Sequence, residues 1–290
     1  DKFEDFIKKN VQIWKDVFDF EPDIIGLGVI SWNRKIAERI ITKLKKKWPD
    51  KWIVAGGKDP TFRPEVYFDF GANFVVMHEG EHTFVDLIEH YGKNFDPHTI
   101  KGLAFKHYDR LIVNEMREPL SMDNLLFPAL DLIDYKQYCN IRLGGIPGHF
   151  IKTGFIMANR GCPYRCRFCT DTVRHIYRER TIENIIAEIK WQMKNWKIGG
   201  MVFLDDLFYY REERVREFCE RVIEEKIKLK FYAQTRVDRI SNHVGLLELM
   251  KRAGFIQLAI GVESGSQRML DIMNKKTNLK QIRNAIERIN

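Results

Sequence analysis

The feature that most constrains this chain is a short loop with three cysteines, in the segment RGCPYRCRFCT at residues 160–170. Cys162, Cys166 and Cys169 follow one another at the spacing C-x3-C-x2-C. An odd number of cysteines in so short a loop does not make a disulfide scaffold, whereas three thiolates can face one point in space. Cuboidal iron–sulfur clusters are held by cysteine thiolates in this way and usually take four of them. A loop that offers three leaves one iron open to a substrate or cofactor.

A structural zinc site is the alternative for the same loop. Zinc would need a fourth Cys or His ligand, and His175 follows Cys169 closely in the sequence. Neither of the two remaining cysteines suggests a ligand. Cys219 lies on the apolar face of an expected helix and is predicted to be buried in the core. Cys139 is predicted to be an inert thiol, because only a special environment makes a cysteine reactive.

The cysteine spacing resembles the signature C-x3-C-x-aromatic-C of the radical S-adenosylmethionine (SAM) superfamily, since the aromatic Phe168 stands just before the last cysteine. In that family the cysteines hold a 4Fe–4S cluster, and the open iron chelates the amino and carboxyl groups of SAM. The reduced cluster then cleaves SAM to a 5′-deoxyadenosyl radical. The resemblance implies that Cys162, Cys166 and Cys169 are the cluster ligands.

The second half of the chain alternates apolar runs of strand length with segments of helical periodicity. The expected strands are 154–158, 199–204, 229–233 and 255–262. The expected helices are 180–197, 212–226, 246–252 and 279–289. Polar residues follow each strand. This is the layout of a β/α barrel, whose active sites lie at the carboxyl ends of the strands.

The resemblance assigns SAM-binding roles to the residues at these strand ends. Asp205, within a pattern F-x-D-D-x-F, stands where the family places the group that binds the SAM amino group. Arg236 suits the SAM carboxylate, because its planar fork matches that geometry. Gln234, on the same strand end, is part of the same predicted site.

Two further strand-end residues and one loop residue complete the predicted SAM site. Glu263 and Ser264 stand where the family binds the ribose hydroxyl groups, and a carboxylate can accept two such hydrogen bonds. Phe168 supplies a backbone contact on the adenine side. Radical SAM barrels have six strand–helix units, so we expect this barrel to be C-terminally incomplete.

The first half of the chain also alternates strand and helix, which predicts an open α/β sheet. The expected strands are 23–30, 52–55 and 74–77, and the expected helices are 2–18, 36–44, 64–70 and 83–90. A β-hairpin is expected over 102–114, with its turn at Asp109-Arg110. Ligands of such sheets bind beyond the carboxyl ends of the strands.

Three loops at these carboxyl ends hold candidate ligand-binding residues. They are Ser31 and Trp32, then Gly56, Gly57, Lys58 and Asp59, then Glu79, Gly80 and Glu81. Glycines there let backbone amides approach a ligand closely, although turn formation alone also explains them.

Together the three loops resemble the cobalamin-binding domain that precedes the barrel in one branch of radical SAM enzymes. In that domain the third loop reads G-E-G-E or similar, and here it reads HEGE, with His78 in place of the first Gly. The usual first strands are missing, so we expect this domain to be N-terminally incomplete. Lys58 and Asp59 would face the lower side of the corrin, but a protonated lysine has no lone pair to offer a metal.

A histidine ligand to cobalt is not expected in this chain. Corrinoid proteins that use one carry D-x-H-x-x-G early in the domain. The near match around His98 has Lys101 where the glycine belongs and lies late in the domain. We therefore predict that His98 is a loop residue, because a motif requires its structural context.

The predicted organisation has three parts. Residues 1–117 form the cobalamin-binding-like α/β domain, 118–149 form a linker that contains Pro119 and Pro128, and 150–290 form the partial (β/α)6 radical SAM barrel.

Composition bounds the class of protein. The 290 residues are 44% hydrophobic and 30% charged, enough to bury a core of one large or two smaller domains. No apolar run approaches the roughly 18 residues of a membrane helix, and no signal peptide is visible. Clustered cysteines indicate a reducing compartment, so we expect a cytoplasmic protein. Because the chain starts at Asp1 rather than Met, we expect it to be a fragment.

The formal net charge of +8 does not by itself indicate a nucleic-acid partner. Lys and Arg are spread over amphipathic segments such as 43–47, where they form solvated faces. The resemblance instead implies an electron donor such as a flavodoxin or ferredoxin, and an unknown substrate that is a small molecule, a lipid or a peptide.

The resemblance implies a cobalamin-dependent radical SAM enzyme, with a 4Fe–4S cluster, SAM and cobalamin as cofactors. In the commonest chemistry of this branch, one SAM methylates cob(I)alamin. A second SAM yields the radical that removes a hydrogen atom from an unactivated carbon, and methylcobalamin delivers the methyl group. We therefore expect methyl transfer.

Three alternatives stay open. The same two domains also serve radical enzymes that form rings or oxidise their substrates without methyl transfer, and the corrinoid domain could be a degenerate interaction module. The third alternative is a cobalamin or redox sensor without turnover, but a sensor has no need to keep Arg236 and Glu263. Radical tRNA methylthiotransferases rank below these, since their N-terminal domain carries further cluster cysteines and none precedes Cys139 here.

Overall fold

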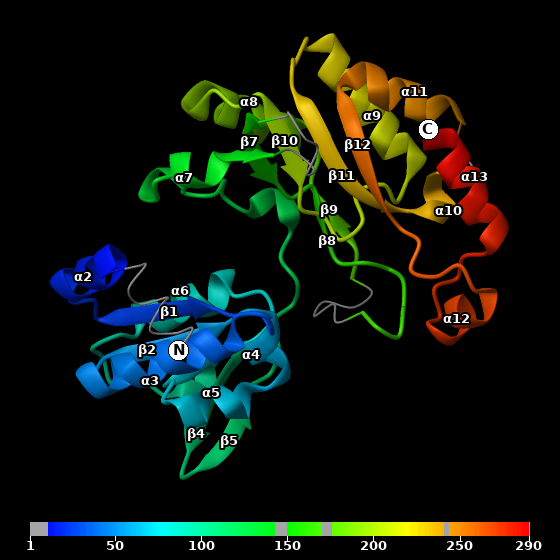
Figure 1. The fold of residues 1–290 in the computed structure, drawn as a ribbon. Helices are drawn as coiled ribbons and strands as arrows, with labels where there is room; N and C mark the ends of the chain where they lie inside the picture. The colour runs from blue at the N-terminus through cyan, green and yellow to red at the C-terminus, as the bar shows by residue number, and fades with distance from the viewer. Residues whose placement is uncertain (1–10, 143–149, 170–175, 241–243, 290) are drawn as a thin grey trace. The chain divides into compact units, whose positions relative to one another are not determined.

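The computed structural model describes residues 11–142, 150–169, 176–240 and 244–289 (Figure 1). The chain divides into two compact units, Asp1–Pro119 and Leu120–Asn290. Each unit is built on a five-stranded sheet, and the second unit also contains a two-stranded ribbon.

The first unit is an open α/β sheet with the strand order β1-β2-β3-β4-β5. Its strands are β1 (Ile24–Gly28), β2 (Trp52–Gly56), β3 (Phe74–Val76), β4 (Leu103–His107) and β5 (Arg110–Val113). Its helices are α2 (Val11–Phe20), α3 (Arg34–Lys47), α4 (Lys58–Phe62), α5 (Pro64–Phe70), α6 (Glu81–Glu89) and the 3-10 turn η1 (Pro97–Thr99). Strands β1 to β3 are parallel, and β4 and β5 continue the sheet antiparallel.

The alternation of side chains along each strand separates the two faces of this sheet. Ile53, Ala55 and Val75 pack with α3 and α5 on one face, whereas Val54 and Val76 pack with α6 on the other. Because both faces are covered, the parallel strands β1, β2 and β3 are apolar throughout rather than alternating.

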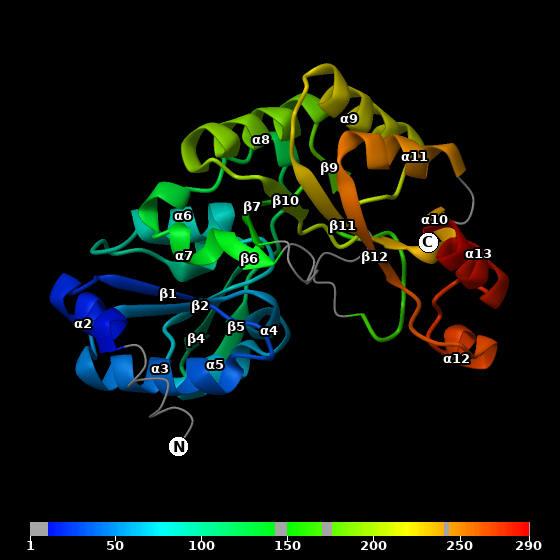
Figure 2. The same ribbon diagram turned by 45° about the horizontal axis from the view of Figure 1, so that its top comes forward.

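The second unit has the strand order β12-β11-β10-β7-β6. Its strands are β6 (Asn140–Arg142), β7 (Phe150–Ile156), β8 (Asn159–Arg160), β9 (Arg178–Glu179), β10 (Gly200–Phe203), β11 (Lys230–Arg236) and β12 (Phe255–Gly261). Its longer helices are α8 (Ile182–Trp196), α9 (Glu212–Glu224), α11 (Val244–Ala253) and α13 (Leu279–Ile289). Strands β7, β10, β11 and β12 are parallel, and β6 is antiparallel at the edge. Figure 2 shows α8, α9 and α11 along one side of the parallel strands.

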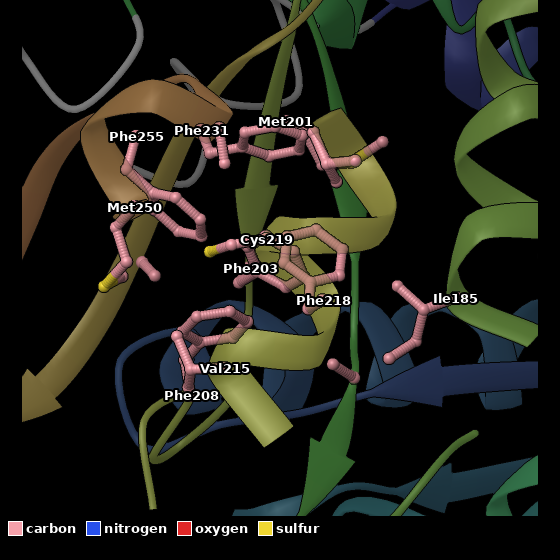
Figure 3. Packing of buried hydrophobic residues seen from close by; sticks show 14 of the residues in the cluster. Ile185, Met201, Phe203, Phe208, Val215, Phe218, Cys219, Phe231, Met250 and Phe255 are labelled. Carbon is pink, nitrogen blue, oxygen red and sulfur yellow. The ribbon is translucent and has the colours of Figure 1, made fainter. Parts of the chain in front are cut away.

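A cluster of aromatic rings fills the space between this sheet and its helices (Figure 3). Phe203 of β10 lies at its centre, with ring centroids 4.3 Å from Phe208, 5.4 Å from Phe218 and 6.0 Å from Phe231. Phe255 of β12 continues the cluster, 5.2 Å from Phe231. Cys219 is buried in this core, as predicted.

The expected hairpin turn at Asp109-Arg110 was wrong by one residue. His107 pairs with Arg110, so the two-residue turn is Tyr108-Asp109. Both turn residues have positive φ, 46° and 61°. Two-residue hairpin turns with this backbone match the right-handed twist of the strands.

Several short elements fall where loops were expected. Helix α4 begins at Lys58, inside the expected loop 56–61, and α10 (Val237–Ile240) and α12 (Gln267–Ile272) were not predicted. Strand β11 extends through Arg236, so Gln234 and Arg236 belong to the strand rather than to the loop after it.

The segment that was expected to be a linker, 118–149, carries short elements of the second unit. They are η2 (Met122–Asn124), η3 (Leu130–Leu132), α7 (Lys136–Cys139) and β6. Within the described ranges, no helix has the length and apolar character needed to cross a membrane.

We expect Phe218→Ala to lower the free energy of unfolding by about 3–5 kcal/mol, because it removes a fully buried ring and leaves a cavity. Phe218 is 2% exposed, whereas Leu126 in the same unit is 94% exposed. Leu126→Ala is therefore the matched control and should change stability by less than about 0.5 kcal/mol. Thermal melting of the two variants, followed by circular dichroism, measures the difference, and equal melting temperatures would contradict the central place of this core.

Candidate cofactor sites

The cysteine loop leaves and rejoins the second unit through a two-stranded ribbon. Asn159 pairs with Glu179 and Arg160 with Arg178, so the two ends of the loop are fixed side by side next to the end of β7. The loop thus extends from the carboxyl edge of the parallel sheet, which is where barrel active sites lie.

The three thiols of the loop differ in exposure. Cys162 and Cys166 are half-buried and Cys169 is exposed. In the described part of the chain, no three His, Cys, Asp or Glu side chains are arranged to hold a metal ion. Thiolates from one accessible loop fit an iron–sulfur cluster. His175, the candidate fourth zinc ligand, lies outside the described residues.

The loop is docked onto the turn that follows α12. The Arg167 backbone N–H donates to the Met273 carbonyl oxygen at 2.9 Å, and the Asn274 side-chain amide donates to the Arg165 carbonyl oxygen at 2.8 Å. These residues are far apart in the sequence, and no local pattern indicates the contact.

Arg236, predicted to bind the SAM carboxylate, is 6% exposed at the last position of β11. Its guanidinium lies on the ring of Tyr164, inside the cysteine loop, and contacts the sulfur of Cys166. The structure therefore brings Arg236 to the cysteine loop, and its contact with SAM stays a prediction.

Glu263 lies close to the same loop through a lysine that the sequence analysis did not single out. The Glu263 carboxylate pairs with the ammonium of Lys275 at 2.7 Å. Lys275 is 5% exposed, and its ammonium lies 5.7 Å from the ring centroid of Phe168. A buried lysine needs such a partner, so Lys275 links the predicted ribose-binding carboxylate to the cysteine loop.

The remaining predicted SAM residues are less closely tied to the loop. The Ser264 hydroxyl accepts from the backbone N–H of Ser266 at 3.1 Å, within the turn after β12. Gln234 is exposed, and its backbone carbonyl oxygen accepts from the Phe208 backbone N–H at 3.1 Å.

Asp205 is buried two residues after β10, with 2% of its surface exposed. One carboxylate oxygen, Oδ1, accepts from the backbone N–H of Asn159, at the start of the ribbon. The other, Oδ2, has no hydrogen-bond partner among the described residues. Burial raises the pKa of Asp205 to about 7, against the opposing effect of backbone donors at Ala158 and Asn159. Buried acceptors normally have partners, so Oδ2 is the atom available for the predicted contact with the SAM amino group.

We expect Asp205→Asn to flatten the dependence of thermal stability on pH between about pH 4 and 7. The raised pKa means that the folded state binds more protons than the unfolded state in this window. Stability is therefore highest at the acidic end and is lost as the pH rises toward the folded pKa. Asn cannot ionise, yet it keeps an oxygen that accepts from Asn159.

Melting temperatures of the wild type and of this variant across that pH range test the prediction. Parallel curves would show that the Asp205 carboxyl does not titrate with folding.

In the first unit, the first two predicted loops are joined by hydrogen bonds at the carboxyl edge of the sheet. Asp59 is buried, and its carboxylate accepts from the Ser31 hydroxyl at 2.8 Å and from the Tyr67 hydroxyl at 2.6 Å. Its backbone N–H donates to the Val29 carbonyl oxygen at 3.2 Å. Asp59 therefore holds Ser31 in place rather than presenting a charge at the surface.

The third loop joins the second through Thr61. The Thr61 hydroxyl donates to the Gly57 carbonyl oxygen and accepts from the His78 backbone N–H, each at 2.9 Å. His78 has a φ of 55° and leads into Glu79, Gly80 and Glu81 at the start of α6. All three predicted loops are thus brought together.

The edge formed by these loops suits a large flat ligand. Trp32 is 92% and Phe62 52% exposed, and Lys58 is also exposed. Gly57 brings bare backbone to the same edge, with a φ of 103°. A corrin ring presents an extensive apolar face with amide groups around it, so exposed aromatic rings beside accessible backbone fit it.

We expect Gly57→Ala to abolish cobalamin loading and leave iron loading intact. A Cβ at Gly57 would lie 2.6 Å from the Val29 carbonyl oxygen, and the left-handed φ adds strain. Gly28→Ala is the matched control, because a Cβ there meets nothing within 4 Å. Metal analysis of both variants after reconstitution measures the effect, and normal cobalt in Gly57→Ala would show that this loop is only a turn.

Comparison with protein families gives two matches that together span most of the chain. The model of the radical SAM superfamily matches residues 156–290, and the model of the B12 binding domain matches residues 4–88. The chain therefore contains a B12-binding domain and a radical SAM domain. A radical SAM domain implies a 4Fe–4S cluster and SAM, and a B12-binding domain supports cobalamin, so the predicted family and cofactors are confirmed.

Among curated relatives, an uncharacterized methyltransferase of Pyrococcus horikoshii is 28% identical over 281 residues, which cover 95% of this chain and 59% of the relative. An anaerobic magnesium-protoporphyrin IX monomethyl ester cyclase of Rubrivivax gelatinosus is 27% identical over 286 residues, covering 95% of this chain and 50% of the relative. The chain thus spans about half to three-fifths of the length of these relatives.

Among solved structures, the cobalamin-dependent S-adenosylmethionine radical enzyme OxsB, with aqua-cobalamin and S-adenosylmethionine bound, has a similar fold. The TM-score is 0.81 at 24% identity, over 96% of this chain and 40% of that chain. The similarity confirms the predicted fold class, a Rossmann-like cobalamin-binding α/β domain followed by a partial radical SAM barrel.

Proposed function

We propose that this B12-binding radical SAM protein cleaves SAM reductively and methylates an unactivated carbon through methylcobalamin. The observation that carries the proposal is the placement of the cysteine loop. It is held at the carboxyl edge of a parallel sheet, with Arg236, Lys275 and Glu263 beside it. A cluster and the polar groups of SAM need to meet at one such edge.

The proposal assigns a role to each predicted residue. The cluster ligands are Cys162, Cys166 and Cys169. The residues proposed to bind SAM are Phe168, Asp205, Gln234, Arg236, Glu263 and Ser264. The residues proposed to bind cobalamin are Ser31, Trp32, Gly56, Gly57, Lys58, Asp59, Glu79, Gly80 and Glu81, with Asp59 acting through its bond to Ser31.

Ring formation without methyl transfer is the second candidate, because the cyclase relative is nearly as similar to this chain as the methyltransferase relative. The bound cofactors would supply the same radical in either case: cluster and SAM generate it, and cobalamin carries a methyl group only in the first. The substrate, and a reductant such as a flavodoxin or ferredoxin, belong to the proposal as well.

We expect Cys166→Ala to lose the cluster and all SAM cleavage, because two thiolates do not hold a cuboidal cluster. Cys219→Ala is the matched control, since Cys219 is buried in the core away from the loop and its loss should spare iron binding. The full chain and both variants are loaded anaerobically with iron, sulfide and hydroxocobalamin, desalted and analysed for metals. About four irons and one cobalt per wild-type chain are expected.

The products of SAM then separate methyl transfer from ring formation. With excess reductant, methyl transfer predicts S-adenosylhomocysteine from methylation of cobalamin in addition to 5′-deoxyadenosine. Release of 5′-deoxyadenosine alone would favour the cyclase chemistry. Cleavage of SAM by Cys166→Ala at the wild-type rate would overturn the radical SAM proposal itself.

A further inference from the structure

We propose that Arg236 is a positioning residue that fixes the Cys166 sulfur and raises the reduction potential of the cluster bound to it. The inference rests on the proposed function, since it requires a cluster on the cysteine loop. It gives Arg236 a role toward the protein and the cluster, beyond its predicted contact with SAM.

The guanidinium of Arg236 directs its nitrogens to three different partners. Nε donates to Asp238 at 2.8 Å, Nη2 donates to the Lys275 carbonyl oxygen at 2.6 Å, and Nη1 lies 3.8 Å from the Cys166 sulfur. A fixed planar fork with this set of partners has little freedom to rotate. The N–H that meets the sulfur is therefore held by the two bonds on the other nitrogens.

The flat face of the same guanidinium is also occupied. It lies 3.6 Å from the ring centroid of Tyr164, which precedes Cys166 in the loop. The Tyr164 hydroxyl donates to Asp238 at 3.2 Å and accepts from Arg239 at 3.0 Å. Asp238 thus holds both the arginine and the tyrosine that stack on each other.

The neighbours of Cys166 in the loop are tied to the same place. Arg165 and Arg167 bond to Asn274 and Met273, in the turn whose Lys275 carbonyl accepts from Arg236. The backbone on both sides of Cys166 and its sulfur are therefore all anchored to the segment 273–275, directly or through Arg236. The protein thus sets the position of the Cys166 thiol before any cluster binds.

A charged N–H donor at a ligating sulfur has a direct electrostatic consequence. Reduction adds negative charge to the cluster and its thiolates, and a nearby cationic donor stabilises that charge. Hydrogen bonds to the sulfurs are among the factors that set the potentials of iron–sulfur clusters. The burial of Arg236 strengthens the effect, because a low local dielectric screens it less.

The test is a redox titration of the reconstituted full chain in the absence of SAM, followed by the electron paramagnetic resonance signal of the reduced cluster. In Arg236→Gln the ratio of reduced to oxidised cluster at a fixed potential should fall about tenfold, which for one electron corresponds to a midpoint potential lower by about 59 mV. Arg236→Lys keeps the charge but loses the fork, and should give a smaller decrease.

Arg239→Gln is the matched control. Arg239 contacts Tyr164 and Asp238 in the same cluster of side chains. Among the described residues, it makes no hydrogen bond to a cysteine sulfur. The reduction potential of the cluster in Arg239→Gln should stay close to that of the wild type. An equal shift in Arg239→Gln, or a wild-type potential in Arg236→Gln, would overturn the inference.

Two further outcomes are informative. Loss of iron loading in Arg236→Gln, with iron loading kept in Arg239→Gln, supports the positioning role. In that case the redox titration is made on Arg236→Lys instead. Weakened SAM binding at an unchanged potential in both Arg236 variants would make Arg236 a SAM ligand alone and overturn the inference. A wild-type chain that binds no iron would instead overturn the proposed function together with it.

Discussion

Parallel pairing of strands is the constraint on which both units depend. It places the carboxyl ends of β1, β2 and β3 at one edge of the first sheet, and those of β7, β10, β11 and β12 at one edge of the second. Loops from distant parts of the sequence are then obliged to meet. In each unit many of the residues that meet there are polar. The helices cover the faces of the sheets, so the carboxyl edge is formed by these loop residues.

Buried charged groups do the cross-linking at both edges. Asp59 in the first unit and Arg236 in the second are almost fully buried, and each bonds to partners from more than one loop. A buried charge without partners is costly in free energy. The hydrogen bonds of Asp59 and Arg236 therefore fix both the charged side chains and their partners in position. The sequence analysis assigned both residues to cofactor binding. In the structure their hydrogen bonds also fix the shape of the site.

The sequence was sufficient to predict most of the architecture and to locate both edges. Apolar runs and helical periodicity indicated the strands and long helices, because burial on both faces of a parallel sheet leaves a clear pattern. The short helices α4, α10 and α12 were missed, since each is too short to show a period. The contacts of Tyr164, Asp238 and Lys275 were also missed, because they depend on tertiary packing between segments far apart in the chain. The residue roles toward SAM and cobalamin were inferred by resemblance and stay predictions.

The ribbon β8–β9 closes the cysteine loop at its base. Its two ends are held together by strand register and not by the metal cluster. The sheet and its aromatic core can therefore fold to completion while the loop is still without iron, and the entropy of closing the loop is already offset when iron arrives. Iron and sulfide would then bind to a scaffold on which the two ends of the loop are already paired.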